Sequence, residues 1–149
     1  MTAKTPLALA FPLSGSQLIE ASAGTGKTFT ISALYLRLVL GHGGESSGFG
    51  RELLPPQILV VTFTDAATKE LRERIRTRLA EAARYFRDET QAPDSLIAEL
   101  RDQYLPEQWS GCANRLDIAA QWMDEAAVSS IHSWCQRMLR EHAFDSGSL

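Results

Sequence analysis

The chain has 149 residues, of which 44% are apolar and 22% charged, and its formal net charge at pH 7 is -3. This length and composition suit one domain with a hydrophobic core and exclude a wholly disordered chain. The small negative charge gives no reason by itself to expect a nucleic-acid-binding protein. Two cysteines, Cys112 and Cys135, stand far apart without a CxxC pair, which argues against a disulfide or zinc framework.

The N-terminal region contains a short apolar stretch, Pro6–Leu13, that faintly resembles a signal peptide. It carries two prolines and is followed by no clean small-residue cleavage site. The other apolar stretch, Ile31–Leu40, is interrupted by Arg37 and is too short to span a bilayer. We therefore expect a soluble, cytoplasmic protein.

The first predicted strand is Gln17–Ala21, a short apolar-leaning run that leads directly into a glycine-rich segment. Apolar residues then crowd Lys27–Leu40, which has the length of a mostly buried helix. Gly41 and the glycines after it predict the end of that helix. Residues 45–56 are rich in Gly, Ser and Pro and predict a loop.

A continuous β-branched and apolar run, Ile58–Phe63, is typical of a strand buried on both faces in a parallel sheet. Asp65 is expected to cap the helix that follows. That helix covers about Ala66–Arg87, and apolar residues recur along it at helical spacing. Its predicted inner face consists of Leu71, Ile75, Leu79, Ala82, Ala83 and Phe86.

The polar residues 91–114 predict short helices joined by loops, with no evident chemistry. A third strand is expected at Ala126–Ile131 and a helix at His132–His142. The alternation of strands and helices predicts an α/β fold in which a parallel sheet is flanked by helices.

The most specific motif is the segment from Ala21 to Thr28. It follows the P-loop pattern G-x-x-x-x-G-K-[ST], with only the first glycine replaced. Gly24 and Gly26 let the backbone curl so that several N–H groups face one anion. Lys27 would supply a full charge to the phosphates of ATP, and the Thr28 hydroxyl would coordinate Mg²⁺. The candidate phosphate-binding residues are Ala21, Ser22, Ala23, Gly24, Thr25, Gly26, Lys27 and Thr28.

A glycine turn between a strand and a helix could match this pattern by coincidence. The Gly-Lys-Thr run, the extra glycine and the flanking elements argue against coincidence. The motif alone leaves the use of ATP open, because kinases, motors and switches share it.

Two further segments bear on the substrate. Phe63 ends the second predicted strand, near the sheet edge where ligands meet α/β sheets, and an aromatic there can stack on a base. Core packing is an equally good interpretation of Phe63. The following helix carries seven basic and three acidic residues, which suits a nucleic-acid backbone. A solvated helix with ion pairs such as Glu70–Arg74 explains these charges at least as well.

The other segment is Ala127–Arg140, in which a predicted strand again ends in serine, histidine and aromatic residues before a helix. A lone histidine such as His132 is usually structural, so this segment indicates little by itself.

Taken together, the segments resemble the UvrD/Rep-type superfamily 1 DNA helicases. The similarity lies in residues 21–28 for motif I, 62–75 for motif Ia and 131–139 for motif Ib. Three motifs in the right order and spacing are far more specific than any one of them. The resemblance covers about residues 11–147.

This resemblance implies a P-loop NTPase of RecA-like fold that uses ATP and Mg²⁺ to translocate 3′→5′ on single-stranded DNA in double-strand-break repair and recombination. Within the family the chain looks most like members that combine helicase and exonuclease activity and work with two partner subunits. Carried over by position, Lys27 would be catalytic and Thr28 would bind Mg²⁺. Phe63 would stack on DNA, and the further DNA contacts would be Thr62, Thr64 and His132.

The resemblance also implies that residues 1–149 are the N-terminal part of the first RecA-like ATP-binding domain of a longer chain. Asp124-Glu125 looks like a Walker B pair, but Ile118–Met123 before it is a poor strand, so we reject that assignment. Gln17 lies too close to the loop to be the adenine-reading glutamine. Without the remaining catalytic parts, this piece is expected to bind nucleotide weakly and to hydrolyse almost none.

The alternative is a P-loop small-molecule kinase or another NTPase that does not act on DNA. It explains residues 21–28 equally well but leaves the matches at 62–75 and 131–139 to chance. A non-catalytic nucleotide- and DNA-binding module is compatible with the helicase interpretation.

Overall fold

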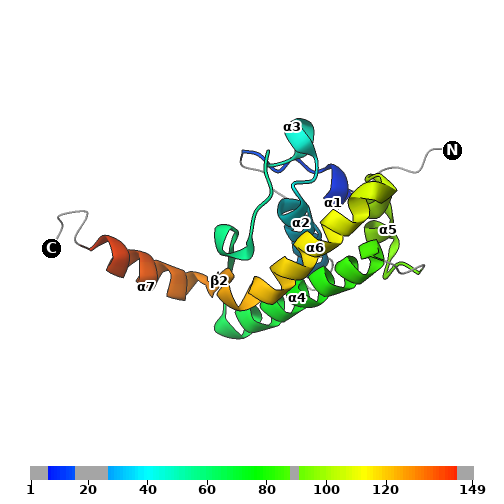
Figure 1. Cartoon of the computed structure of the whole chain (residues 1–149). Helices are drawn as coiled ribbons and strands as arrows, with labels where there is room; N and C mark the ends of the chain where they lie inside the picture. Colours follow the sequence, from blue (N-terminus) through cyan, green and yellow to red (C-terminus); the bar gives the residue numbers. More distant parts are fainter. Residues whose placement is uncertain (1–6, 16–26, 88–90, 144–149) are drawn as a thin grey trace.

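The computed structural model of the chain describes residues 7–15, 27–87 and 91–143. Three long helices form the body, a two-stranded sheet lies at one end of it, and the last helix extends away (Figure 1). The elements in chain order are α1 (Leu7–Ala10), α2 (Lys27–Leu40), α3 (Gly44–Ser47), η1 (Pro55–Gln57), β1 (Leu59–Thr62), α4 (Asp65–Arg87), α5 (Ser95–Asp102), η2 (Pro106–Gln108), α6 (Trp109–Gln121), η3 (Trp122–Glu125), β2 (Ala127–Ser130) and α7 (Ile131–His142).

The hydrophobic core lies where α4 packs along α6 and α2. Every residue of the predicted inner face of α4 is buried. Leu79 of α4 and Leu116 of α6 are both fully inaccessible to solvent. Burial of a leucine side chain contributes about 1.5–3 kcal/mol, so this seam holds α4 firmly in place.

Helix α2 has the predicted bounds and is buried along much of its length. It ends where expected, because Gly41 has a φ of 69°, in the left-handed region that glycine adopts without strain. The amide of His42 then donates to the Arg37 carbonyl at 2.9 Å, which satisfies a group at the end of the helix.

Arg37, near the end of α2, is fully buried. Among the described residues its hydrogen-bond partners are uncharged. Nη1 donates to the carbonyls of Ala8 and Phe11, and Nη2 donates to the Ser47 carbonyl at 3.2 Å. Nε donates to His42 Nδ1 at 2.8 Å. The guanidinium therefore fastens the N-terminal segment and α3 to α2.

His42 continues this buried network. Since its Nδ1 accepts a hydrogen bond from Arg37, the ring hydrogen lies on Nε2, which is 2.5 Å from Gln103 Oε1. Burial lowers the pKa of His42, the hydrogen bond to Gln103 opposes this shift, and the charge of Arg37 adds to it. The Tyr104 ring packs 6.1 Å from the imidazole. The fold thus favours a neutral histidine.

The strands β1 and β2 pair in parallel, from Leu59 opposite Ala127 to Thr62 opposite Ser130. Each is one residue shorter at both ends than the predicted run. The strand predicted at residues 17–21 lies outside the described residues.

The prediction that the first of these strands is buried on both faces is wrong for this structure. Leu59 is 48% exposed and Val61 is 40% exposed. The reason is that α4 and α7, which both contact β1, leave these two side chains largely open to solvent.

The region between α4 and β2 is helical, as predicted for residues 91–114, and α6 continues to Gln121. Asp94 caps α5 by accepting a hydrogen bond from the Ile97 amide at 3.0 Å. Residues 118–123 are helical, which agrees with their rejection as a Walker B strand. The predicted loop at 45–56 contains most of α3 and leads into η1. Within the described residues, no helix is long and apolar enough to cross a membrane.

Candidate functional site

The first turn of α2 carries the two described residues of the predicted phosphate loop. Lys27 is exposed and Thr28 is half-buried. The first turn contains no acidic residue, and no described residue forms an ion pair with Lys27. An ammonium and a hydroxyl at the start of a helix are a donor set suited to phosphate and Mg²⁺. Both residues therefore fit the predicted ATP and Mg²⁺, while residues 21–26 lie outside the described part of the chain.

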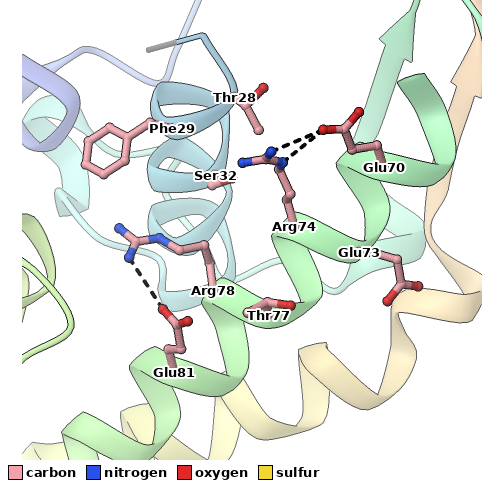
Figure 2. Close-up of a pocket in the computed structure, with 9 residues that line it drawn as sticks. All are labelled: Thr28, Phe29, Ser32, Glu70, Glu73, Arg74, Thr77, Arg78 and Glu81. Atoms are coloured by element: carbon pink, nitrogen blue, oxygen red, sulfur yellow. Dashed lines mark hydrogen bonds and ion pairs between the residues drawn. The ribbon is translucent and has the colours of Figure 1, made fainter. Parts of the chain in front are cut away.

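A pocket of about 470 Å³ lies between α2 and α4 next to Thr28 (Figure 2). Figure 2 shows Thr28 and Ser32 on one wall and the side chain of Arg74 extending toward them from the other. The full lining is Thr28, Phe29, Ser32, Glu70, Glu73, Arg74, Thr77, Arg78 and Glu81. Helix α4 begins shortly after β1 ends and lines this pocket opposite Thr28, so one helix connects the N-terminal end of α2 to the sheet.

The charges in this pocket compensate one another. Arg74 is 3.1 Å from Glu70, and Arg78 is 2.7 Å from Asp94. The Arg78 guanidinium also lies 5.2 Å from the centre of the Phe29 ring. These arginines are held by α4 and its neighbours, so the pocket by itself is not a strongly positive anion site.

The second candidate region is the edge formed by the carboxyl ends of β1 and β2. Because Thr62 is paired with Ser130, the residues that follow the two strands leave the sheet side by side. We call this region the strand-end edge: residues 62–65, which begin with the last residue of β1, and residues 130–133, which begin with the last residue of β2. All four predicted DNA contacts lie in it, although they come from segments almost 70 residues apart.

Phe63 is 92% exposed. The alternative that it packs in the core is therefore wrong in this structure. Ile131, at the corresponding position after the neighbouring strand, is 48% exposed, and His132 is also exposed. An aromatic side chain open to solvent at the carboxyl end of a parallel strand has the position and chemistry that stacking on a base would require.

The threonines at this edge hold the start of α4. Thr62 Oγ1 lies 2.6 Å from Thr68 Oγ1 and 2.9 Å from the Thr64 carbonyl. Thr64 Oγ1 accepts a hydrogen bond from the Ala67 amide at 3.0 Å. Thr64 is therefore the cap, and the prediction that Asp65 caps α4 is wrong because Asp65 already lies in the first turn.

A hydrogen bond that the sequence analysis missed joins the two halves of the strand-end edge. Ser133 Oγ donates to Asp65 Oδ1 at 3.3 Å. Asp65 lies three residues after Thr62, and Ser133 lies three residues after Ser130, with which Thr62 is paired. This equal spacing from the two strand ends was the only sign in the sequence that Asp65 and Ser133 could meet.

The positive charge on α4 is largely neutralised, as the solvated-helix alternative predicted. Glu70 and Arg74 form the expected i,i+4 pair at 3.1 Å. Arg76 pairs with both Glu73 and Asp124. Arg72 instead donates to the Val128 carbonyl at 3.0 Å, which ties α4 to β2. The helix as a whole is not a free basic face for nucleic acid.

The pair Asp124-Glu125 lies in η3, before β2 begins and not at the end of a strand. Asp124 is 79% exposed in its ion pair with Arg76. Within the described residues, no group of three or more His, Cys, Asp or Glu side chains could hold a metal ion.

Comparison with known proteins defines the class. Residues 1–149 match the family described as UvrD/REP helicase N-terminal domain. The chain belongs to this family, which confirms the resemblance drawn from the three motifs.

Among individual proteins, the chain is similar to the RecBCD enzyme subunit RecB of Escherichia coli strain K12, with 53% identity over 144 residues. It is 43% identical over 144 residues to the same subunit of Haemophilus influenzae, and 34% identical over 123 residues to that of Mycolicibacterium smegmatis. These alignments cover 95%, 93% and 83% of this chain. The chain spans only 12%, 12% and 10% of those relatives.

Proposed function

We propose that this chain forms the N-terminal part of the first RecA-like ATP-binding domain of a RecB-like DNA helicase subunit. Lys27 and Thr28 would hold the phosphates and Mg²⁺ together with residues 21–26. The proposed cofactors are ATP and Mg²⁺, and the proposed substrate is DNA. The observation that carries the proposal is the meeting of motifs Ia and Ib at one sheet edge, beside an exposed Phe63.

The finer parts of the proposal follow the similarity to RecB. They are 3′→5′ translocation on single-stranded DNA, association with exonuclease activity, a role in double-strand-break repair and recombination, and cytoplasmic location. RecC-like and RecD-like subunits are the proposed partners, since the relatives are described as subunits of RecBCD enzymes.

When bound, ATP would supply the phosphoanhydride bond whose hydrolysis drives movement, and Mg²⁺ would neutralise charge on its phosphates. The chain's own residues would bind and orient. Lys27 would place a positive charge at the phosphates, and Thr28 would offer a hydroxyl oxygen to the metal. Phe63 would stack on a base without regard to sequence, as a translocating protein requires.

The DNA part of the proposal is tested by the affinity of the full-length protein for a fluorescent oligothymidylate, measured by anisotropy. Replacing Phe63 by alanine should weaken binding about fivefold to a hundredfold, the range expected for loss of one stacked base. Phe49→Ala is the matched control, because Phe49 is a 46% exposed aromatic outside the strand-end edge. Equal affinities for the wild type and both variants would contradict a DNA role for Phe63.

The ATP part is tested on the 149-residue chain. It should bind a fluorescent ATP analogue weakly and release almost no phosphate, because groups that position water and stabilise charge at the γ-phosphate would come from elsewhere in the enzyme. Turnover that persists through additional purification and disappears in Lys27→Ala would contradict this expectation.

A further inference from the structure

The junctions that follow β1 and β2 are joined by a chain of hydrogen bonds. Ser130 Oγ lies 3.0 Å from Ser133 Oγ and accepts from the Ser133 amide at 3.2 Å. Ser133 Oγ in turn donates to Asp65 Oδ1 at 3.3 Å. The chain therefore runs from the end of β2 through the first turn of α7 to the first turn of α4.

Ser130 gives this chain a fixed starting point. It is only 3% exposed, it is the N-cap of α7, and it is paired with Thr62 across the sheet. If its hydroxyl donates to Ser133 Oγ, the Ser133 hydrogen is left to point at Asp65. The buried Ser130 hydroxyl thus determines that Ser133 donates to Asp65.

Helix α7 has few other attachments in the described part of the chain. None of its residues is buried, and its most extensive contacts within the described residues are with the two strands. Figure 1 shows it extending away from the helical body. A bond between its first turn and α4 therefore has more influence on its orientation than the same bond would have in a packed core.

We propose that Ser133 and Asp65 act as a latch that fixes His132 relative to Phe63. Both are positioning residues, and neither is proposed to touch DNA. The latch would hold the two halves of the strand-end edge at one separation, so that a single strand meets both together. This inference rests on the proposed function, because it assigns the latch a purpose only if the edge binds DNA.

Asp65 has a second effect that must be separated from the first. Its carboxylate is exposed at the edge proposed for DNA, where it repels phosphate groups. Asp65→Asn removes the charge but keeps an oxygen that can accept from Ser133. Asp65→Ala removes both. Ser133→Ala removes the donor to Asp65, and with it the hydroxyl partner of Ser130, but keeps the Ser133 amide that donates to Ser130.

The test measures oligothymidylate affinity by anisotropy and amide hydrogen exchange of the first turn of α7 in the full-length protein. Ser133→Ala and Asp65→Ala should each weaken DNA binding about threefold to tenfold, the range for loss of one hydrogen bond. Combining them should add little, because both remove the same bond. Asp65→Asn should bind at least as well as the wild type. Exchange should accelerate in the alanine variants and remain slow in Asp65→Asn.

The matched controls are Ser110→Ala and Asp102→Asn, which alter exposed helical residues whose side chains form no hydrogen bond with a described residue. They should change neither readout, and the melting temperature and nucleotide affinity should stay constant throughout. Additive losses, unchanged affinity in Ser133→Ala, or an Asp65→Asn variant as weak as Asp65→Ala would overturn the latch.

Failure of the latch and failure of the proposed function give different results. If the wild type binds no single-stranded DNA, the proposed function fails whatever the variants do. Hydrogen exchange still tests the latch in that case, since unchanged exchange in Ser133→Ala would show that the bond does not fix α7. If the wild type binds DNA and Phe63→Ala weakens it, unchanged affinity in the latch variants overturns the latch alone.

Discussion

The two ends of α2 carry basic residues in opposite circumstances. Lys27 at the start of the helix is exposed and forms no ion pair with a described residue. Arg37 near its end is fully buried and donates to three backbone carbonyls and to His42. A buried cation whose donors are occupied stabilises the fold, whereas an exposed cation at a helix start is free to bind an anion.

This difference shows how to separate structural from functional polar groups in the rest of the chain. The arginines of α4 resemble Arg37, because most are engaged by carboxylates or backbone carbonyls. The strand-end edge resembles Lys27, because Phe63 and His132 are open to solvent. If polar groups divide in this way, substitutions of the first kind should change stability and substitutions of the second kind should change binding.

Replacing Arg37 by methionine should lower the free energy of unfolding by about 2–4 kcal/mol, because several carbonyls and His42 lose their donor. Urea denaturation of the chain measures this. Arg51→Met is the control, since Arg51 is exposed and lies 5.9 Å from the centre of the exposed Phe49 ring; its effect should stay within about 0.5 kcal/mol. Equal stability of the two variants would contradict a structural role for Arg37 and with it the contrast between Arg37 and Lys27.

Lys27→Ala should reduce nucleotide binding and leave stability unchanged. We expect ATP-analogue affinity of the full-length protein to fall about tenfold to a hundredfold, as for loss of a charge-assisted contact, with no change in melting temperature. Lys69→Ala is the matched control, because Lys69 is an exposed lysine on α4. A loss of stability in Lys27→Ala without loss of nucleotide affinity would make Lys27 structural.

Thr64 combines both kinds of role, since it caps α4 and lies in the strand-end edge. Thr64→Ala should cost about 1 kcal/mol of stability, the usual value for a lost N-cap. Thr64→Ser keeps the capping oxygen and should restore that stability. If Thr64→Ala unfolds at the same denaturant concentration as the wild type, the hydrogen bond to Ala67 is not an effective cap.

The smallest effect expected is a pH dependence from His42. Burial lowers the pKa of His42 below its usual value near 6.5, so the folded chain favours the neutral ring. Its contribution to stability is complete above about pH 6.5 and is lost as the pH falls toward the lowered pKa. Protonation of His42 Nδ1 would make that atom a donor facing the Nε–H donor of Arg37. Gln103 and Tyr104 offer no negative charge to compensate.

Urea denaturation of wild type and His42→Gln between pH 7.5 and 5 measures this contribution, because the variant lacks only the His42 imidazole and keeps every other ionisable group of the chain. The wild type should lose more stability than the variant on acidification. Parallel profiles would show that His42 is not the titrating group.

Much of this architecture was predictable because it depends on local pattern. The apolar period of α4 fixed its buried face, and Gly41 marked the end of α2. The cap of α4 was misassigned because Thr64 and Asp65 are adjacent residues that can both cap a helix, and only the backbone geometry decides between them.

Interactions between distant segments were not predictable. In the sequence, Arg37 only interrupts an apolar stretch. Its structural role could not be predicted, because its partners Ala8, Phe11 and Ser47 become its neighbours only when the chain folds. The bond between Asp65 and Ser133 likewise depends on the pairing of β1 with β2. The exposure of Phe63 was left open by the sequence, since an aromatic at a strand end suits a core as well as a surface.

The most direct test of the central claim is steady-state ATP hydrolysis by the full-length protein with and without single-stranded DNA, with Lys27→Ala as the blank. We predict strong stimulation by DNA that is absent in Lys27→Ala and that requires more DNA in Phe63→Ala. Hydrolysis indifferent to DNA would contradict the account, because the chain would then be a P-loop NTPase whose strand-end edge has no part in its reaction.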